Sequence, residues 1–273
     1  MKANTIIRRF GRFAACVAML AAAACTGNFE DYNTKPFRPS DDDLNGDNVG
    51  VGILFPAMME FVTHFQVNAS QMHDVLVADE LGGYTSAVKS YQGQNIATYN
   101  PSDKFNDYIF EQTFANFYGN YFKVETQTGG EGPVYQLARI LRVAAMLRVT
   151  DAYGPIPYSK LESNESVYVE YDSQEAVYTK MFEELDEAIE ILGRNTTLPA
   201  EAWSRYDGVY YGNIAQWLKY ANSLKLRMAM RLSYVKSDVA RAKAAAAIAG
   251  GVIEANADNA AMHAAENRTT LIY

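Results

Sequence analysis

The sequence predicts an all-α fold, an α-solenoid of stacked helix pairs connected by long irregular loops. Apolar residues recur every three or four positions in several separate segments after residue 48, which is the period of an amphipathic helix. The segment 212–236 is apolar on two sides, and such a helix has to pack on two sides inside a stack. Polar stretches with Gly and Pro separate the helical segments, as expected for loops.

Residues 1–24 predict a signal peptide. Four basic residues and no acidic residue stand near its start: Lys2, Arg8, Arg9 and Arg12. The apolar run over residues 13–24 is too short to cross a bilayer but suits a signal-peptide core. Small residues precede Cys25, as at a lipoprotein cleavage site, so we expect Cys25 to carry a lipid anchor. The alternative is ordinary secretion with an unmodified thiol.

Residues 25–48 are polar, with two prolines and an acidic cluster, and predict a tether between the membrane and the folded domain. The first half of a calcium-binding loop is present at Asp41, Asp43 and Asn45. The twelfth position of that motif needs a bidentate glutamate, but it is Gly52. The three residues are therefore a weak metal candidate, and a solvated linker is the favoured interpretation.

The charge of the chain argues against a nucleic-acid partner. Lys and Arg number 24 against 32 Asp and Glu, which gives a formal net charge of −8. Loss of residues 1–24 would leave 20 basic residues and a net charge of −12. A chain this acidic, without a basic stripe, repels phosphate backbones.

A helix and then a polar loop follow the tether. The apolar stripe over residues 51–79 predicts one long helix, or two that join near Asn68. Residues 82–102 lose the period and are rich in Tyr, Asn, Gln, Ser and Gly. Long loops often bind ligands, and tyrosine rings with amides suit a sugar. The ligand candidates here are Tyr84, Tyr91, Asn95 and Tyr99. The alternatives are an ordered loop without a ligand or a protein-contact loop.

Three further helices come next. Residues 107–125 have a broad aromatic face, and residues 133–152 are apolar nearly all round, so both are expected in the core. The segment 154–159 contains a glycine and two prolines, which predict an extended corner. Asp172 and Glu175 are expected to begin the third helix as a capping box. Its acidic residues are expected to be solvated or to pair with neighbouring basic edges.

The last segments complete the predicted stack. Residues 195–211 form a second long loop, where Trp203 is another ligand candidate, although an indole that fills a gap between helices is more frequent. Helices are predicted over residues 212–236 and 238–250, and pairs of this size are typical of tetratricopeptide-like solenoids. Because the chain ends on apolar residues without a polar cap, we expect the helical domain, residues 49–273, to be incomplete at its C-terminus.

Three segments match sequence motifs of one protein family, and they follow one another along the chain in the order found in that family. Residues 151–158 (DAYGPIPY) fit D-x-Y-G-x-x-P-Y, and residues 178–188 fit Y-x-x-(I/M)-x-x-(E/D)-L-x-x-A. Residues 212–231 contain Gly-Asn, a tryptophan, ANSLKLR and AMR, which match the sequence of a signature helix. Together they resemble the SusD/RagB family of surface nutrient-binding lipoproteins from Bacteroidetes-type bacteria. In the starch-binding member of the family, a loop between early helices contacts the sugar. The loop over residues 82–102 resembles it in position along the chain, and no individual residue is matched.

This resemblance implies a non-enzymatic protein on the outside of the outer membrane. It would hold an oligosaccharide or a peptide and pass it to a SusC-type TonB-dependent transporter. No metalloprotease, serine-hydrolase or paired-cysteine metal motif is present in the sequence, so no catalytic residue and no cofactor are expected. The alternatives are a helical-repeat scaffold that binds only another protein and, less favoured, an exported hydrolase.

Overall fold

The computed structural model describes residues 49–63, 67–86, 88–89, 96–161, 168–194 and 203–262, all within the unit Asp47–Tyr273. Several predicted features lie outside these residues: the signal peptide 1–24, Cys25, the tether with Asp41, Asp43 and Asn45, and the loop candidates Tyr91 and Asn95. Their roles and the limits of the predicted domains stay predictions.

Helices are the regular elements of the described part, so the all-α prediction is confirmed. The long ones are α7 (Asp103–Thr128), α8 (Gly132–Tyr153), α9 (Gln174–Arg194), α11 (Ile214–Arg231) and α12 (Ser237–Ala249). The short ones are α4 (Val49–Gly52), α5 (Phe55–Met59), α6 (Val67–Ser70), η2 (Gln71–Asp79), η3 (Ile96–Thr98) and η4 (Asn256–Asp258). In these segments, no helix has the length and apolar character that a membrane span requires.

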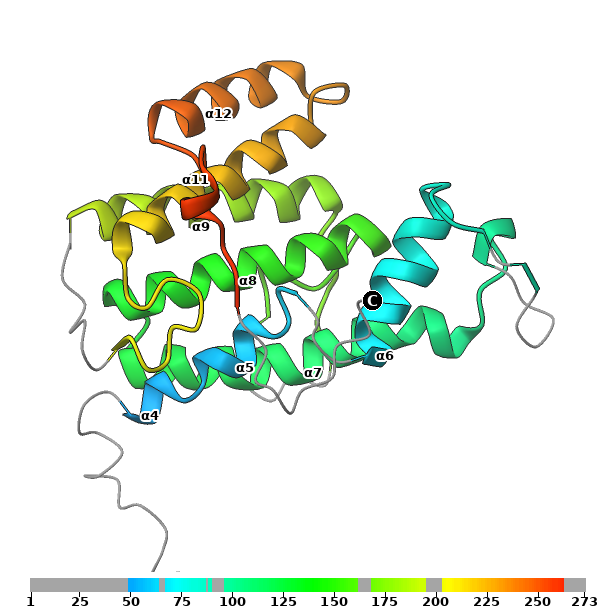
Figure 1. Ribbon diagram of the computed structural model, residues 1–273, viewed down its shortest axis with the longest axis horizontal. Coiled ribbons are helices and arrows are strands. Elements are labelled where there is room, and N and C mark those ends of the chain that lie inside the picture. Colours follow the sequence, from blue (N-terminus) through cyan, green and yellow to red (C-terminus); the bar gives the residue numbers. More distant parts are fainter. Residues whose placement is uncertain are drawn as a thin grey trace, which may run out of the picture. The chain divides into compact units, whose positions relative to one another are not determined.

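The long helices pack in chain order, as Figure 1 shows. Helix α7 contacts α8, α8 contacts α9, α9 contacts α11, and α11 contacts α12, while α5 lies against both α7 and α8. Helices α8, α9 and α11 therefore each pack between two neighbours, which is the arrangement expected of a solenoid. Most side chains of α8 are buried, in agreement with the apolar pattern of its sequence.

The region between residues 51 and 79 is more interrupted than the sequence predicted. It contains α4, α5 and, further on, α6 running into η2, a stretch with π-helical hydrogen bonding. Pro56 lies in the first turn of α5. Because proline has no N–H, it cannot continue the hydrogen-bond ladder of α4, so a new helix begins there. The prediction of one helix, or of two that join near Asn68, is wrong at this point.

Local caps explain where the long helices begin and end. The Ser102 Oγ accepts a hydrogen bond from the Phe105 N–H at 3.2 Å before α7, and the Asn213 Oδ1 accepts one from the Gln216 N–H at 3.3 Å before α11. Gly129 ends α7 in the left-handed region, with φ 66°, where a residue without Cβ is favoured.

The capping box predicted for α9 is wrong. Ser173 takes that position, since its Oγ accepts a hydrogen bond from the Ala176 N–H at 3.3 Å. Asp172 is instead paired in a β-bridge with Ile156. Its carboxylate accepts hydrogen bonds from the Tyr158 N–H at 3.2 Å, the Ser159 N–H at 2.6 Å and the Ser159 Oγ at 2.8 Å. Asp172 therefore fixes the corner 154–159 rather than the helix.

Candidate functional site

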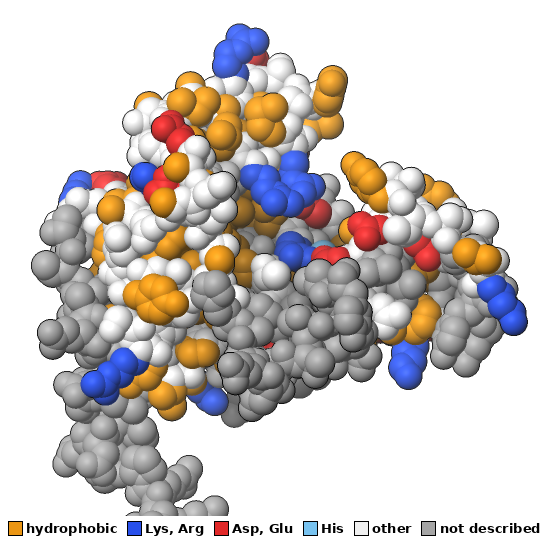
Figure 2. Space-filling model, viewed as in Figure 1, with side chains coloured by type: hydrophobic (Ala, Val, Ile, Leu, Met, Phe, Trp, Pro, Cys, Tyr) orange, Lys and Arg blue, Asp and Glu red, His pale blue; other side chains and the backbone are white. Residues whose placement is uncertain are grey.

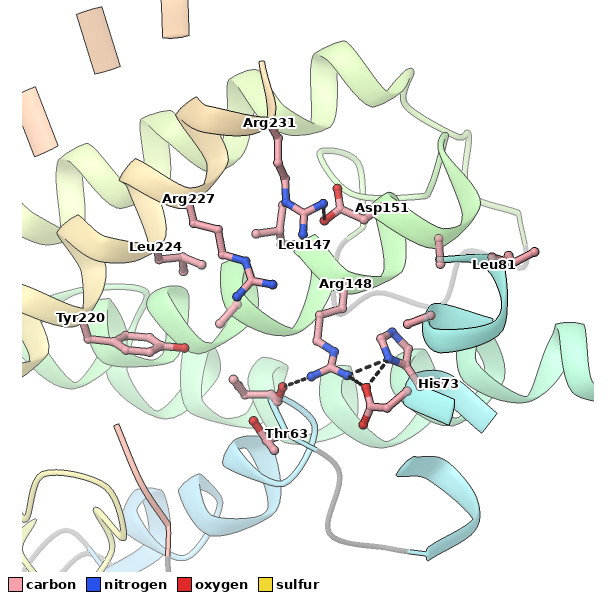
Figure 3. A pocket seen from close by; sticks show the side chains of 15 residues that line it. Thr63, His73, Leu81, Leu147, Arg148, Asp151, Tyr220, Leu224, Arg227 and Arg231 are labelled. Atoms are coloured by element: carbon pink, nitrogen blue, oxygen red, sulfur yellow. Dashed lines mark hydrogen bonds and ion pairs between the residues drawn. The ribbon is translucent and has the colours of Figure 1, made fainter. Parts of the chain in front are cut away.

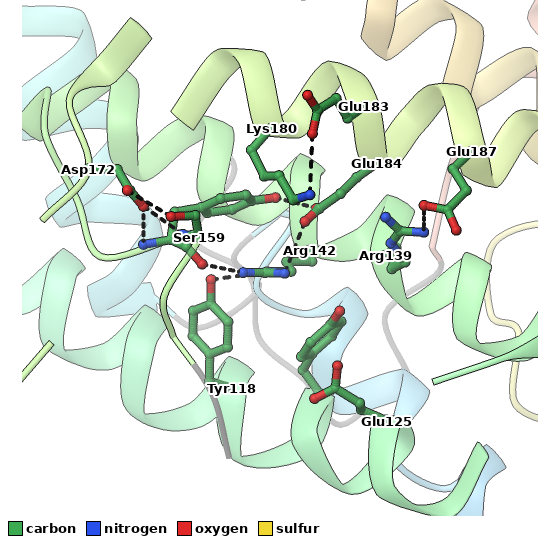
Figure 4. Close-up of polar contacts among 12 residues, drawn as sticks. Tyr118, Glu125, Arg139, Arg142, Ser159, Asp172, Lys180, Glu183, Glu184 and Glu187 are labelled. Carbon is green, nitrogen blue, oxygen red and sulfur yellow. Dashed lines mark hydrogen bonds and ion pairs between the residues drawn. The ribbon is translucent and has the colours of Figure 1, made fainter. Parts of the chain in front are cut away.

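A buried ion pair between Arg142 of α8 and Glu184 of α9 holds the corner 154–159 in place (Figure 4). The Arg142 Nη1 lies 3.1 Å from the Glu184 Oε1, and its Nη2 donates to the Tyr158 carbonyl at 2.6 Å. The Tyr158 hydroxyl donates to the other Glu184 oxygen at 2.6 Å. Because every partner is paired, the charges are compensated inside the core.

Tyrosine rings enclose the Arg142 guanidinium. The ring centroids of Tyr158, Tyr121 and Tyr118 lie 4.2, 5.1 and 5.5 Å from its Cζ, which are cation–π distances. Burial by itself would lower the pKa of Arg142, but Tyr118, Tyr158 and Glu184 raise it well above the usual value, so it stays charged. Burial also raises the pKa of Tyr118 to about 12. The cluster is structural, and it connects three helices and the corner.

Two of the predicted ligand tyrosines are exposed, in the segments around residues 84 and 99. The side chain of Tyr84 is 86% exposed, and that of Tyr99 is 81% exposed. Tyr99 has φ 57°, a left-handed conformation that is rare for a bulky residue, and its N–H donates to the Ile96 carbonyl at 2.8 Å. Both segments lie towards the N-terminal end of α7 (Figure 1). Their rings are therefore free to contact a ligand.

Trp203 has a different environment. Its side chain is 1% exposed, and its ring meets that of Phe55 edge-on, with centroids 4.7 Å apart. It fills a gap between α5 and the stack, which is the packing role that the sequence also allowed. The indole has no face open to a ligand in this structure. Gly52 packs nearby against the ring of Tyr206, 2.2 Å from where a Cβ would stand, so the twelfth position of the calcium motif has no room for a side chain.

Asp207 organises the loop after Trp203, and no pattern in the sequence predicts this role. It is buried, and its Oδ1 accepts hydrogen bonds from the N–H groups of Val209 and Tyr210, both at 3.0 Å. Its Oδ2 accepts from the Gly212 N–H at 2.8 Å and the Trp217 Nε1 at 2.7 Å. Both carboxylate oxygens are thus used for the loop that leads into α11, and none remains for a ligand.

A cavity of about 570 Å³ lies between α8, α11 and the segment 62–81 (Figure 3). Its polar lining residues are Thr63, His73, Asp74, Arg148, Asp151, Tyr220, Arg227 and Arg231. Its apolar walls include Ala144, Leu147 and Leu224. Figure 2 shows Lys and Arg side chains gathered around a hollow on this face of the molecule. Helical periodicity did not predict that the arginines of α8 and α11 meet at one cavity.

The contacts of Arg148 and Arg231 hold one side of this cavity in a defined geometry. Arg148 pairs with Asp74, contacts the His73 Nδ1 at 2.6 Å and donates to the Val62 carbonyl at 3.1 Å. Arg231 pairs with Asp151 at 2.8 Å. Burial raises the pKa of Asp74, but its hydrogen bond with His73 and the charge of Arg148 outweigh this and lower it to about 2. Burial raises the pKa of Asp151, which Tyr178 and Arg231 only partly offset.

In the described part of the chain, no group of three or more His, Cys, Asp or Glu side chains is arranged to hold a metal ion. The chemistry that these residues offer is non-covalent: exposed aromatic rings, arginine donors and a hollow with apolar walls. Such groups recognise a ligand through stacking, hydrogen bonds and charge.

The family follows from a comparison with known proteins. A family model described as Susd and RagB outer membrane lipoprotein matches residues 31–273. The chain belongs to the SusD-like family. The three motifs of the sequence, and the stack of helices that contains them, are therefore those of SusD-like proteins. Among curated proteins, no relative matches the chain.

Solved SusD-like structures share the fold. A homologue from Bacteroides ovatus ATCC 8483 is 38% identical, with a TM-score of 0.71 over 80% of this chain and 45% of its own. One from Bacteroides thetaiotaomicron VPI-5482 is 37% identical, with a TM-score of 0.72 over 80% of this chain and 45% of its own. A chitin-binding homologue from Flavobacterium johnsoniae is 33% identical, with a TM-score of 0.69 over 77% and 45%. This chain thus spans about 45% of the length of these relatives.

Proposed function

We propose that this chain belongs to a cell-surface lipoprotein that binds a nutrient, an oligosaccharide or a peptide, and passes it to a SusC-type TonB-dependent transporter. In this proposal the protein is anchored in the outer membrane through Cys25, faces the cell exterior and catalyses no reaction. The observation that carries the proposal is membership of the SusD-like family over residues 31–273. A relative that is similar over most of this chain is described as chitin-binding, which favours a glycan.

The exposed tyrosines supply a physical means of binding. Tyr84 and Tyr99 present almost their whole rings to solvent, although burial would remove large apolar surfaces from water. An aromatic ring that covers the C–H face of a sugar gains that contact without the loss of many rotamers. The left-handed backbone at Tyr99 is a strained conformation of the kind found at ligand sites.

Isothermal titration with neutral oligosaccharides, including a chito-oligosaccharide, and with short neutral peptides tests this role. The double substitution Tyr84→Ala and Tyr99→Ala is expected to weaken binding about five- to thirtyfold, because loss of the stacking contacts costs about 1–2 kcal/mol in total. The matched control is Tyr234→Ala, since Tyr234 is also fully exposed but lies between α11 and α12. Equal losses in the double variant and in the control would contradict a role of the loop.

The experiments that test the lipid anchor and the transporter partner are carried out in the native host. Labelling with a radioactive fatty acid is expected to mark the wild-type protein and to leave Cys25→Ala unmarked, because the thiol is the acyl acceptor at a lipoprotein cleavage site. Affinity purification from outer membranes is expected to recover a TonB-dependent transporter. Purification of a soluble protein partner alone would instead support the scaffold alternative, and release of products from a glycan would support a hydrolase.

A further inference from the structure

We propose that the arginine-lined cavity between α8, α11 and the segment 62–81 binds a carboxylate group of a small organic ligand. The cavity, of about 570 Å³, falls in the size range of ligand pockets in proteins. Its described lining residues come from three elements and do not include Tyr84 or Tyr99. It is therefore a site separate from the exposed tyrosines and goes beyond the function proposed above.

Arg227 is the arginine that is available to a ligand. It lines the cavity, is exposed, and its side chain makes no ion pair or hydrogen bond with the described residues, as Figure 3 also shows. Its neighbour one helical turn later, Arg231, is already paired with Asp151. A guanidinium has a planar set of five donors that matches the two oxygens of a carboxylate. An unpaired guanidinium that borders a hollow favours an anionic ligand there.

The other ionisable groups of the cavity leave an excess of positive charge. Three arginines, Arg148, Arg227 and Arg231, face two carboxylates, Asp74 and Asp151. The remaining ionisable side chains that line it are those of His73 and Tyr220. His73 lies against Arg148, with the Nδ1 within 2.6 Å of the Nη2.

The Tyr220 hydroxyl adds a neutral donor on the α11 side. It points towards the cavity in Figure 3 and makes no hydrogen bond with the part of the chain that the structure describes. Burial raises the pKa of Tyr220 to about 12, so the hydroxyl keeps its proton at neutral pH. A carboxylate oxygen that reaches into the cavity therefore meets a phenol donor as well as the arginines.

The apolar walls distinguish an organic carboxylate from a free inorganic anion. Ala144, Leu147 and Leu224 line the same space, and they gain from contact with carbon atoms rather than with water. The ligand class that fits both the arginines and the apolar walls is a carboxylate on a compact carbon framework. An acidic sugar such as a uronate and an acidic peptide share this chemistry, and the experiment below separates them.

The test uses isothermal titration of the full chain with trigalacturonic acid, triglutamate, maltotriose and inorganic phosphate. Saturable binding of at least one of the two carboxylated probes is expected, without comparable binding of maltotriose or phosphate. Arg227→Gln should weaken it about tenfold, the loss that one charge-assisted bidentate contact produces. Arg241→Gln is the matched control, because Arg241 is exposed on α12 and is not a lining residue.

A second variant tests the cavity itself. Ala78 lines the cavity from η2 and is exposed, so Ala78→Trp can narrow the space without disturbing the core, and binding of the carboxylated probe should be lost. If neither carboxylated probe binds at millimolar concentration, or if binding is the same in wild type, Arg227→Gln and Ala78→Trp, the proposal is wrong. Binding by the double tyrosine variant should be unchanged, so a failure here is distinguishable from a failure of the proposed function.

Discussion

Replacement of Glu184 by alanine is expected to destabilise the fold far more than replacement of the acidic residues beside it. The side chain of Glu184 is 3% exposed, and its partner Arg142 is 10% exposed. Removal of the carboxylate would leave the Arg142 guanidinium charged in the core. The effect differs from that of a surface pair because solvent cannot reach the remaining charge.

The magnitude follows from the contacts that are lost and those that remain. Glu184 accepts one hydrogen bond from Arg142 and one from the Tyr158 hydroxyl, and charge-assisted bonds contribute about 1.5–3 kcal/mol each. Arg142 keeps its bond to the Tyr158 carbonyl and its contacts with three rings, which partly compensate the charge. We therefore expect a loss of about 3–4 kcal/mol in the free energy of unfolding, near the lower end of the range for broken buried pairs.

Urea denaturation followed by circular dichroism at 222 nm measures the free energy of unfolding. Glu183→Ala is the control, since Glu183 is next in sequence on α9 but is 61% exposed, and pairs with Lys180 at 3.2 Å. Its loss is expected to cost about 0.5 kcal/mol or less.

A double substitution separates the loss of the Glu184 hydrogen bonds from the cost of leaving the Arg142 charge unpaired. Arg142→Met together with Glu184→Leu removes both charges, and should be more stable than Glu184→Ala alone because no unpaired charge remains. If Glu184→Ala is within about 1 kcal/mol of the Glu183→Ala control, or if the double variant is the less stable of the two, the interpretation of the cluster is refuted.

Three further predictions concern other buried or half-buried groups. The pKa of Asp74 is lowered from 3.8 to about 2 in the folded chain, so its carboxylate stabilises the fold above pH 4 and this contribution disappears as the pH falls from 4 to 2. Because Asp74 is 42% exposed, the contribution is about 1 kcal/mol, and Asp74→Asn should flatten the acid limb of a stability–pH curve. Trp203→Ala should cost about 3–5 kcal/mol, as for other buried aromatic residues, in thermal denaturation; unchanged stability with lost ligand binding would contradict its packing role. Asp207→Asn should cost about 2–3 kcal/mol, because its new amide faces the Gly212 N–H or the Trp217 Nε1, and a shift in tryptophan fluorescence should accompany the loss; a wild-type melting temperature and spectrum would argue against it.

The helical class and the family could both be predicted from the amino-acid sequence alone. Local features suffice for both: apolar residues at helical spacing decide which segments become helices, and the glycine and two prolines of the segment 154–159 exclude a helix there. The motif in residues 212–231 is identified from its consecutive residues, without any knowledge of contacts with distant parts of the chain. The exposure of Tyr84 and Tyr99 agrees with the predicted loop, because a loop without periodicity has no buried face, while their role in ligand binding stays a prediction.

Which polar residues are buried, and which of them contact one another, depends on how the helices pack in three dimensions. Six acidic residues lie on α9, yet Glu184 alone pairs with Arg142, which is 42 positions away in the sequence. Asp172 looked like a helix cap, but the corner offered its carboxylate three donors at once. The arginines of the cavity come from α8 and α11, which are brought together by packing that helical periodicity does not specify. The free energy of a charge depends on its surroundings in three dimensions, and periodicity along one helix contains no information about them.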